Sequence, residues 1–159
     1  MNKSDLLAAL QAEHDAIEHA IAGLTPEQMT APGALANGWS VKDLLAHLAA
    51  WEAEMVSALF HAVHGRTPSL GRALQDIDAW NAERHAENAG RPLDRVLADW
   101  RGVRHALMQR VKGWAEEELG SEVSWHPGHS LVDLIKENSY GHEAEHRDDL
   151  ETYCRRVTA

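Results

Sequence analysis

Apolar residues recur at intervals of three and four over four long stretches of the chain, the spacing that places them on one face of an α-helix. Ser40 and Ser130 each precede such a stretch and are followed three residues later by an aspartate, a typical pattern of a helix N-terminus. The third stretch opens on Pro92 and places Arg104 among its apolar positions. The predicted long helices span residues 4–23, 40–64, 92–120 and 130–156.

The segments between the long helices are short. Residues 25–28 predict a capped turn, and the Pro, Gly and Asn of residues 31–38 predict a loop. After a break at residues 65–68, residues 69–88 predict a more polar helix anchored by Ile77 and Trp80. No strand pattern of useful length occurs. The chain therefore predicts an all-α fold, an up-down four-helix bundle with an additional helix inserted between helices 2 and 3, formed by residues 1–159 as a single domain.

The formal charge of −10 and the scattered basic residues argue against a phosphate-binding surface, so we expect no nucleic acid partner. No run of about 20 apolar residues predicts a membrane span, and no signal peptide precedes the first helix. The single cysteine, Cys154, allows no internal disulfide and fits a reducing compartment. These features predict a cytoplasmic protein without membrane contact.

His142-Glu143-Ala144-Glu145-His146 matches the H-E-x-x-H pattern of zinc peptidases. A zinc site needs a third protein ligand, and residues 147–153 supply neither a His nor the usual Gly-containing extension. A peptidase is therefore the least favoured interpretation. We expect Glu143 and Glu145 to face solvent or neighbouring helices rather than to act as a general base.

His142 and His146 lie about 40° apart on a helical wheel, so both imidazoles leave one face. Leu131 and Ile135 mark that face as buried, so its polar residues need a partner inside the bundle. A metal, a polar pocket or hydrogen bonds among the side chains would each satisfy them. From upstream, His47 or His14 could complete a triad, with His47 favoured.

Two segments of the chain, residues 38–52 and residues 142–155, resemble the second-helix and fourth-helix motifs of the DinB-like superfamily. The resemblance implies a four-helix bundle that holds a divalent metal, most often nickel or zinc. Asp148-Asp149 replaces the common Gly-Gln of that motif, and Asp149 could instead orient His146 or a metal-bound water. Carried over by this resemblance, the metal ligands are His47, His142 and His146.

A second likeness lies in the inserted helix, where Asp76-Ile77-Asp78-Ala79-Trp80-Asn81 resembles the Asp-Ile-Asp-x-x-Asn run of the ClbS/DfsB branch. That branch includes a colibactin self-resistance protein that opens an electrophilic ring with water. Its members often lack the complete triad that this chain has. The two likenesses therefore imply different chemistry at the same bundle.

The leading hypothesis is a metal-dependent thiol transferase or hydrolase that acts on electrophilic small molecules in detoxification or stress response, with a low-molecular-weight thiol such as bacillithiol or mycothiol as co-substrate. Metal-independent addition of water, with Asp76, Asp78 and Asn81 near the pocket, and a non-catalytic stress-induced binding protein are the alternatives. Superfamily relatives also suggest a homodimer. The candidate catalytic residues are Asp149, Tyr153 and Asn81, and the candidate substrate pocket is built by Trp51, Trp80 and Trp100.

Overall fold

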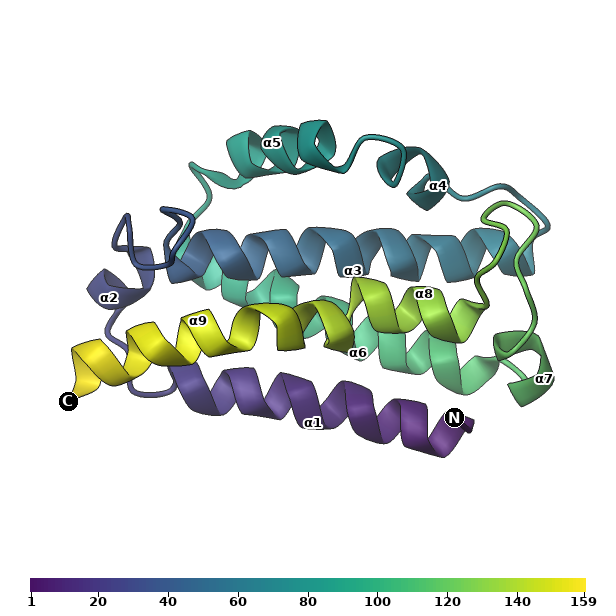
Figure 1. The fold of residues 1–159 in the computed structure, drawn as a ribbon, viewed down its shortest axis with the longest axis horizontal. Helices are drawn as coiled ribbons and strands as arrows, with labels where there is room; N and C mark the ends of the chain where they lie inside the picture. Colours follow the sequence, from purple (N-terminus) through teal and green to yellow (C-terminus); the bar gives the residue numbers. More distant parts are fainter.

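A computed structural model describes residues 1–159 as nine helices without a strand. The long helices lie side by side as a bundle (Figure 1), which confirms the predicted all-α helical bundle. The elements of the bundle are α1 (Lys3–Ile21), α3 (Val41–Val63), α6 (Leu93–Gly113) and the consecutive pair α8 (Leu131–Asn138) and α9 (Tyr140–Thr158).

The helix starts follow the capping signals of the sequence. Ser40 Oγ accepts a hydrogen bond from the Asp43 amide at 3.0 Å, and Asp43 Oδ2 accepts one from the Ser40 amide at 3.0 Å. Ser130 and Asp133 make the same reciprocal pair at the start of α8. Each pair satisfies amide groups that a helix N-terminus leaves without partners.

The inserted segment is an arch over α3 rather than one helix. It consists of α4 (Leu70–Ala73) and α5 (Ile77–Asn88), which Figure 1 shows above the bundle. Trp80 packs its ring on that of Trp51 at 4.2 Å, as expected of an anchor, whereas Ile77 is 47 % exposed. None of the residues of α5 is fully buried. This helix therefore covers α3 without being packed tightly into the core.

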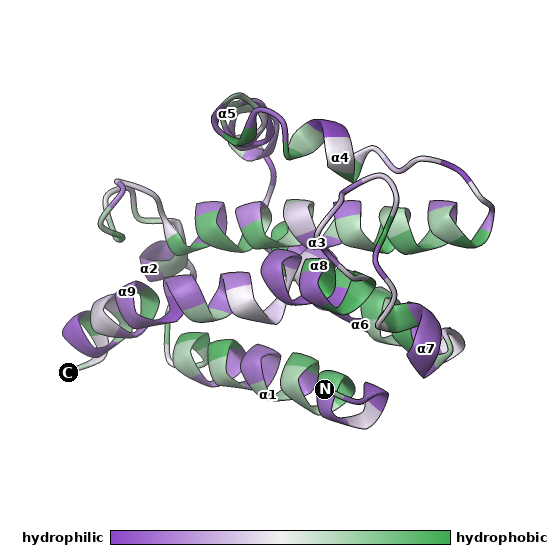
Figure 2. Ribbon diagram, turned by 45° about the vertical axis from the view of Figure 1, so that its right-hand side comes forward, coloured by the Kyte–Doolittle hydropathy of each residue, from purple (hydrophilic) through white to green (hydrophobic).

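Two short helices complete the chain, α2 (Pro26–Thr30) and α7 (Glu116–Leu119). The third long helix ends at Gly113, earlier than the predicted 120, because Trp114 is extended at φ −89° and ψ 146°. Figure 2 shows that α9 is more hydrophilic than α1 and α3. This helix therefore contributes many polar side chains to the bundle.

The predicted fourth helix is interrupted at Ser139, whose φ of −140° and ψ of −107° end α8. The Ser139 hydroxyl donates to the Ile135 carbonyl, and Asn138 Nδ2 donates to the Leu134 carbonyl at 2.8 Å. These side chains satisfy carbonyl groups that the broken helix leaves free. The chain then resumes as α9, so the H-E-x-x-H segment begins within a new first turn.

Gly141 is required by this break, because a Cβ at that position would lie 2.7 Å from the Lys136 carbonyl oxygen. We expect Gly141→Ala to lower the free energy of unfolding by about 2 kcal/mol, since the backbone itself must shift. Gly102→Ala in α6 is the matched control, because nothing lies within 4 Å of the place its methyl group would take. Urea unfolding should show the control unchanged or slightly stabilised. Equal effects of the two changes on the free energy of unfolding would contradict the proposed clash between a side chain at position 141 and the Lys136 carbonyl oxygen.

Candidate metal centre

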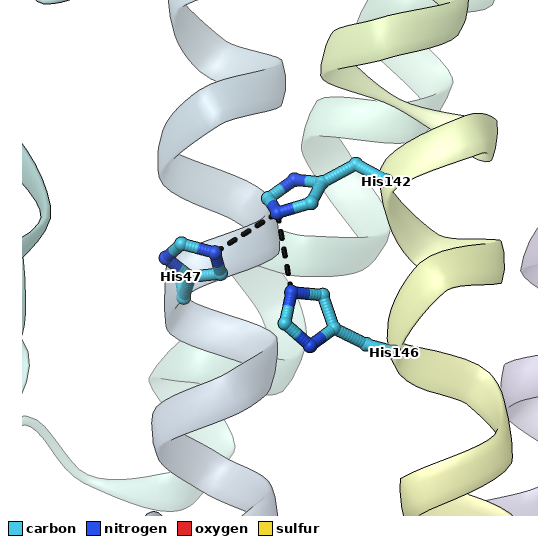
Figure 3. Close-up of side chains that lie close together, drawn as sticks. All are labelled: His47, His142 and His146. Atoms are coloured by element: carbon cyan, nitrogen blue, oxygen red, sulfur yellow. Dashed lines mark hydrogen bonds between the residues drawn. The ribbon is translucent and has the colours of Figure 1, made fainter. Parts of the chain in front are cut away.

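Three imidazoles converge between α3 and α9. His47 comes from α3, while His142 and His146 project from successive turns of α9 (Figure 3). His47 Nε2 lies 3.0 Å from His142 Nε2, and His146 Nε2 lies 3.3 Å from the same atom. The structure thus brings together the three histidines selected from the sequence.

The two nitrogen separations at His142, 3.0 and 3.3 Å, fit a divalent ion, and the ligand atoms of all three histidines lie within 4.8 Å of one another. Histidine nitrogens bind zinc at about 2.0–2.1 Å, which places neighbouring ligand atoms about 2.9–3.4 Å apart for bond angles of about 90–109°. A neutral imidazole nitrogen carries either one proton or one lone pair. His142 Nε2 faces two other nitrogens and can make a good hydrogen bond with only one of them. A cation shared by three lone pairs would satisfy all three side chains.

The imidazoles are held neutral. Burial, followed by the neighbouring His146, lowers the pKa of His47 from 6.5 to about 4. Burial, followed by His47 and His146, lowers the pKa of His142 to about 3, and burial also lowers that of His146. Neutral imidazoles keep the lone pairs that a metal needs.

These pKa shifts predict a pH dependence of stability in the metal-free protein. Above pH 6.5 both the folded and the unfolded chain leave His47 and His142 uncharged, so the full stability is present. Below pH 6.5 His47 and His142 bind protons in the unfolded chain but stay unprotonated in the folded chain, so the free energy of unfolding falls. We expect a loss of about 2–3 kcal/mol from pH 6.5 to pH 5, at about 1.4 kcal/mol per pKa unit. Urea unfolding of a His47→Gln/His142→Gln variant should show a flatter profile.

A pocket of about 520 Å³ opens above the imidazoles, beneath the α4–α5 arch. Within it, Trp51 Nε1 donates to Asn81 Oδ1 at 2.8 Å, which ties α5 to α3. The side chains that line the pocket are Asn37, Trp39, His47, Trp51, Leu74, Ile77, Asn81, Glu137, Asn138, His142 and His146.

Of the three tryptophans predicted to build the pocket, one lines it and two do not. Trp51 lines the pocket, and Trp80 stands behind it with the Arg84 guanidinium over its ring. Trp100 does not reach the pocket: it is fully buried and stacks on His14 at 4.1 Å between ring centroids. The apolar stripe of α6 carries it toward α1 instead. His14, the other candidate for the triad, is therefore placed away from the imidazole cluster.

The three candidate catalytic residues do not lie together in the structure. Asn81 lines the pocket, but Asp149 Oδ2 accepts from the Ala36 amide at 3.0 Å, and the Tyr153 hydroxyl donates to the Gln28 carbonyl at 2.6 Å. Both of these side chains tie α9 to the segment before α3. Asp76 caps α5 by accepting from the Ala79 amide, and Asp78 is exposed. Only Asn81 of these polar candidates lies at the pocket.

Trp39 is a pocket residue that the sequence interpretation missed. Its ring meets His47 edge-on at 5.0 Å and stacks on His85 of α5 at 5.1 Å. The sequence feature that could have indicated this role is the position of Trp39 directly before Ser40, the N-cap of α3. A tryptophan at that position lies at the end of the helix, where it can border a pocket. Trp39 and Trp51 together give the pocket two indole walls.

Glu143 is fully buried, so of the two predicted orientations it takes the one toward a neighbouring helix and not the one toward solvent. Glu143 Oε2 pairs with Arg104 Nη2 at 2.8 Å, and Glu143 Oε1 accepts from Trp100 Nε1 at 3.1 Å. Arg104 also donates to both oxygens of Glu52, at 2.5 and 3.0 Å, and to the Leu10 carbonyl. One guanidinium thereby joins α1, α3, α6 and α9 behind the histidine face. Burial raises the pKa of Glu52, with Arg104 opposing this effect.

The helical bundle with its inserted arch has a DinB-like fold. The chain belongs to the mycothiol maleylpyruvate isomerase N-terminal domain family, which it matches over residues 10–133. That range contains His47 and ends before His142 and His146. No match is found among curated proteins.

Two crystal structures share the fold. An uncharacterised protein from Escherichia coli UTI89 superposes with a TM-score of 0.87 at 15% identity, covering 98% of this chain and 94% of the other. The colibactin self-resistance protein ClbS, in complex with a dsDNA, superposes with a TM-score of 0.83 at 16% identity, covering 96% of this chain and 94% of the other. At this identity the likeness establishes the shared architecture.

The ClbS complex contradicts the expectation that nucleic acid is no partner, because a protein of this fold is seen with double-stranded DNA. The net charge of −10 is a sum over the whole chain, whereas phosphate contacts depend on local groups of side chains. Net charge was therefore an insufficient basis for that exclusion.

None of the helices combines the length and apolar character needed to cross a membrane.

Proposed function

We propose that this protein binds a divalent metal, nickel or zinc, through His47, His142 and His146 and uses it to add a low-molecular-weight thiol to an electrophilic small molecule. The observation that carries the proposal is the convergence of three Nε2 atoms at the base of a pocket. Three protein ligands leave coordination positions free, as in catalytic rather than structural sites. The family description names mycothiol, which supports a thiol as co-substrate.

A divalent ion bound there would supply Lewis acidity that lowers the pKa of a thiol or water at its open position. The chain's own residues would supply the rest. Trp39 and Trp51 would exclude water from the electrophile, and Asn81 would orient it from α5. Glu143 has no role as a general base in this proposal, because its carboxylate is occupied by Arg104 and Trp100.

The proposal predicts thiol-dependent consumption of an electrophile that adds a thiol without losing a group, such as an epoxide. With nickel or zinc and mycothiol or bacillithiol, we expect the initial rate to exceed that of the thiol alone by at least about 100-fold, a modest share of typical enzymatic acceleration. The rate should fall to background with His47→Ala. Product masses from liquid chromatography would show the thioether.

The same assay discriminates the alternatives. Loss of electrophile at an equal rate without thiol or metal, with a product heavier by one water, would favour a ClbS-like hydrolase. In that case Asn81, which lies at the pocket, is the residue to substitute next. Binding without turnover under every condition would favour a non-catalytic binding protein.

A further inference from the structure

Two asparagines line the pocket above the histidines, and in each of them the protein bonds one amide atom and leaves the other without a partner. Trp51 Nε1 donates to Asn81 Oδ1 at 2.8 Å. An indole N–H can only donate, so this bond determines which amide atom of Asn81 faces Trp51. Asn81 Nδ2 makes no hydrogen bond within the protein. Asn81 therefore presents hydrogen-bond donors to the pocket from α5.

Asn138 has the opposite polarity. Its Nδ2 donates to the Leu134 carbonyl at 2.8 Å, and a carbonyl oxygen can only accept. Asn138 Oδ1 is left as an acceptor on the pocket lining, in a residue that is only 4% exposed. Leaving a polar atom of so buried a side chain without a partner costs free energy. The end of α8 therefore presents an acceptor that a bound molecule can satisfy.

Two further side chains of the lining extend this pattern. Asn37 Oδ1 accepts from the Trp39 backbone amide at 3.0 Å, which leaves Asn37 Nδ2 as a donor. Glu137 adds a carboxylate next to Asn138 at the end of α8. Figure 1 shows α5 above α3 and α8 below it. The pocket thus has donors from α5 and from the loop before α3, and acceptors from α8.

We propose that the electrophile bound here is a conjugated amide, with its carbonyl oxygen toward Asn81 Nδ2 and its N–H toward Asn138 Oδ1. The inference rests on the proposed function in taking this pocket as the substrate site. A trans amide directs its C=O and its N–H to opposite sides of one plane, as the two asparagines require. Its flat conjugated part fits against the indoles of Trp39 and Trp51. A volume of about 520 Å³ is ample for such a molecule.

This orientation suits the addition of a thiol. The sulfur would bond to the β-carbon of the double bond, and negative charge would collect on the carbonyl oxygen. The hydrogen of the thiol would end on the α-carbon, so that no group is lost. Asn81 Nδ2 would donate to the carbonyl oxygen as it becomes negative, which stabilises the charge that forms during the reaction. Asn81 thereby couples recognition of the amide to the addition.

N-methylcinnamamide and methyl cinnamate test the pattern, because they share one shape and differ only in an N–H in place of an ester oxygen. Titration calorimetry is done at pH 8 with the full chain stripped of metal, so that no cation competes with Asn81 for the carbonyl oxygen. An amide loses more hydration than an ester on burial, so a pocket without a partner for the N–H would prefer the ester. We expect the amide to bind at least tenfold more tightly. Equal binding, a preference for the ester, or no binding of either probe would overturn the proposal.

The donor is assigned by substitution of Asn81. Asn81→Asp keeps an oxygen for the Trp51 N–H but replaces the donor with a second acceptor, so it should weaken both probes at least tenfold. Ala82→Asp is the matched control, because it adds the same charge at an exposed position of α5. It should leave both affinities unchanged. Equal effects of the two substitutions would show that Asn81 does not bind the carbonyl oxygen, and would overturn the proposal.

The acceptor is assigned by Asn138→Ser. A serine hydroxyl can bond the carbonyl four residues before it, as Ser139 does with Ile135, so the Leu134 carbonyl keeps a donor. The shorter side chain withdraws the acceptor from the pocket, and the preference for the amide over the ester should disappear. Circular dichroism verifies the fold of each variant. An unchanged preference in the folded Asn138→Ser variant would overturn the proposal.

The outcome is separable from that of the proposed function. Probe binding to metal-free protein needs neither metal nor thiol, so loss of the amide preference would overturn the ligand class alone. Absence of metal binding or of thiol-dependent turnover would overturn the proposed function while leaving the affinity measurements intact.

Discussion

Replacing His142 with alanine is expected to lower the affinity of the protein for nickel or zinc by at least about 100-fold, because His142 Nε2 is the atom that both other imidazoles approach. Without His142, only His47 and His146 remain as ligands, and they lie on separate helices. The ligand that lies next to both of them would be missing. Titration calorimetry on protein first stripped with chelator gives the affinity. Elemental analysis after dialysis against the metal gives the stoichiometry, which should fall from about one to near zero.

The matched control is His105→Ala, which removes an exposed histidine from α6. It should retain wild-type affinity and stoichiometry. Binding of less than about a tenth of an equivalent by the wild-type protein, or unchanged affinity in His142→Ala, would refute the three-histidine centre. Circular dichroism of the metal-free variants separates loss of a ligand from loss of the fold.

Replacing Arg104 with methionine is expected to lower the free energy of unfolding by about 3–5 kcal/mol, the usual cost of removing one partner from a buried ion pair. Glu52 and Glu143 would be left facing each other without their shared cation, and the Leu10 carbonyl would lose its donor. Arg104 is 2% exposed, so water would not readily replace it. Urea unfolding measures the loss.

Arg101→Met is the matched control, since Arg101 lies on the same helix and also pairs with a glutamate, Glu18, but with a half-exposed side chain. An exposed pair of this kind contributes about 1 kcal/mol or less. Adding Glu52→Gln and Glu143→Gln to Arg104→Met should recover much of the stability, because the stranded charges are removed with the guanidinium. Equal losses in Arg101→Met and Arg104→Met would show that burial of the network does not matter.

The signals within single helices were reliable. Ser40 and Ser130 cap α3 and α8 as their aspartates indicated, because a capping box is complete within four residues. His142 and His146 share one face of α9, because helical geometry alone determines that relation. Arg104 stands among the apolar positions of α6, but its burial and its partners came only from the structure.

Relations between helices were harder to predict. Glu143 lies about 100° from His142 on α9, a direction that pointed to solvent or to another helix until the position of Arg104 on α6 was known. Trp100 belongs to the buried face of α6, yet packing on His14 of α1, rather than its own periodicity, excluded it from the pocket. The break at Ser139 had one local indication, Gly141, which a regular helix also tolerates at modest cost.

The sequence by itself determined the four long helical stretches, their capped starts at Ser40 and Ser130 and the shared face of His142 and His146, since periodicity and capping act within a few residues along one helix axis. Only the tertiary structure decided that His47 meets that pair, that Arg104 joins four helices behind it, and that Trp39 and Trp51 wall the pocket. These contacts depend on how far each helix is rotated about its axis and shifted along it. Those two quantities arise from packing between helices, which no single stretch of sequence specifies.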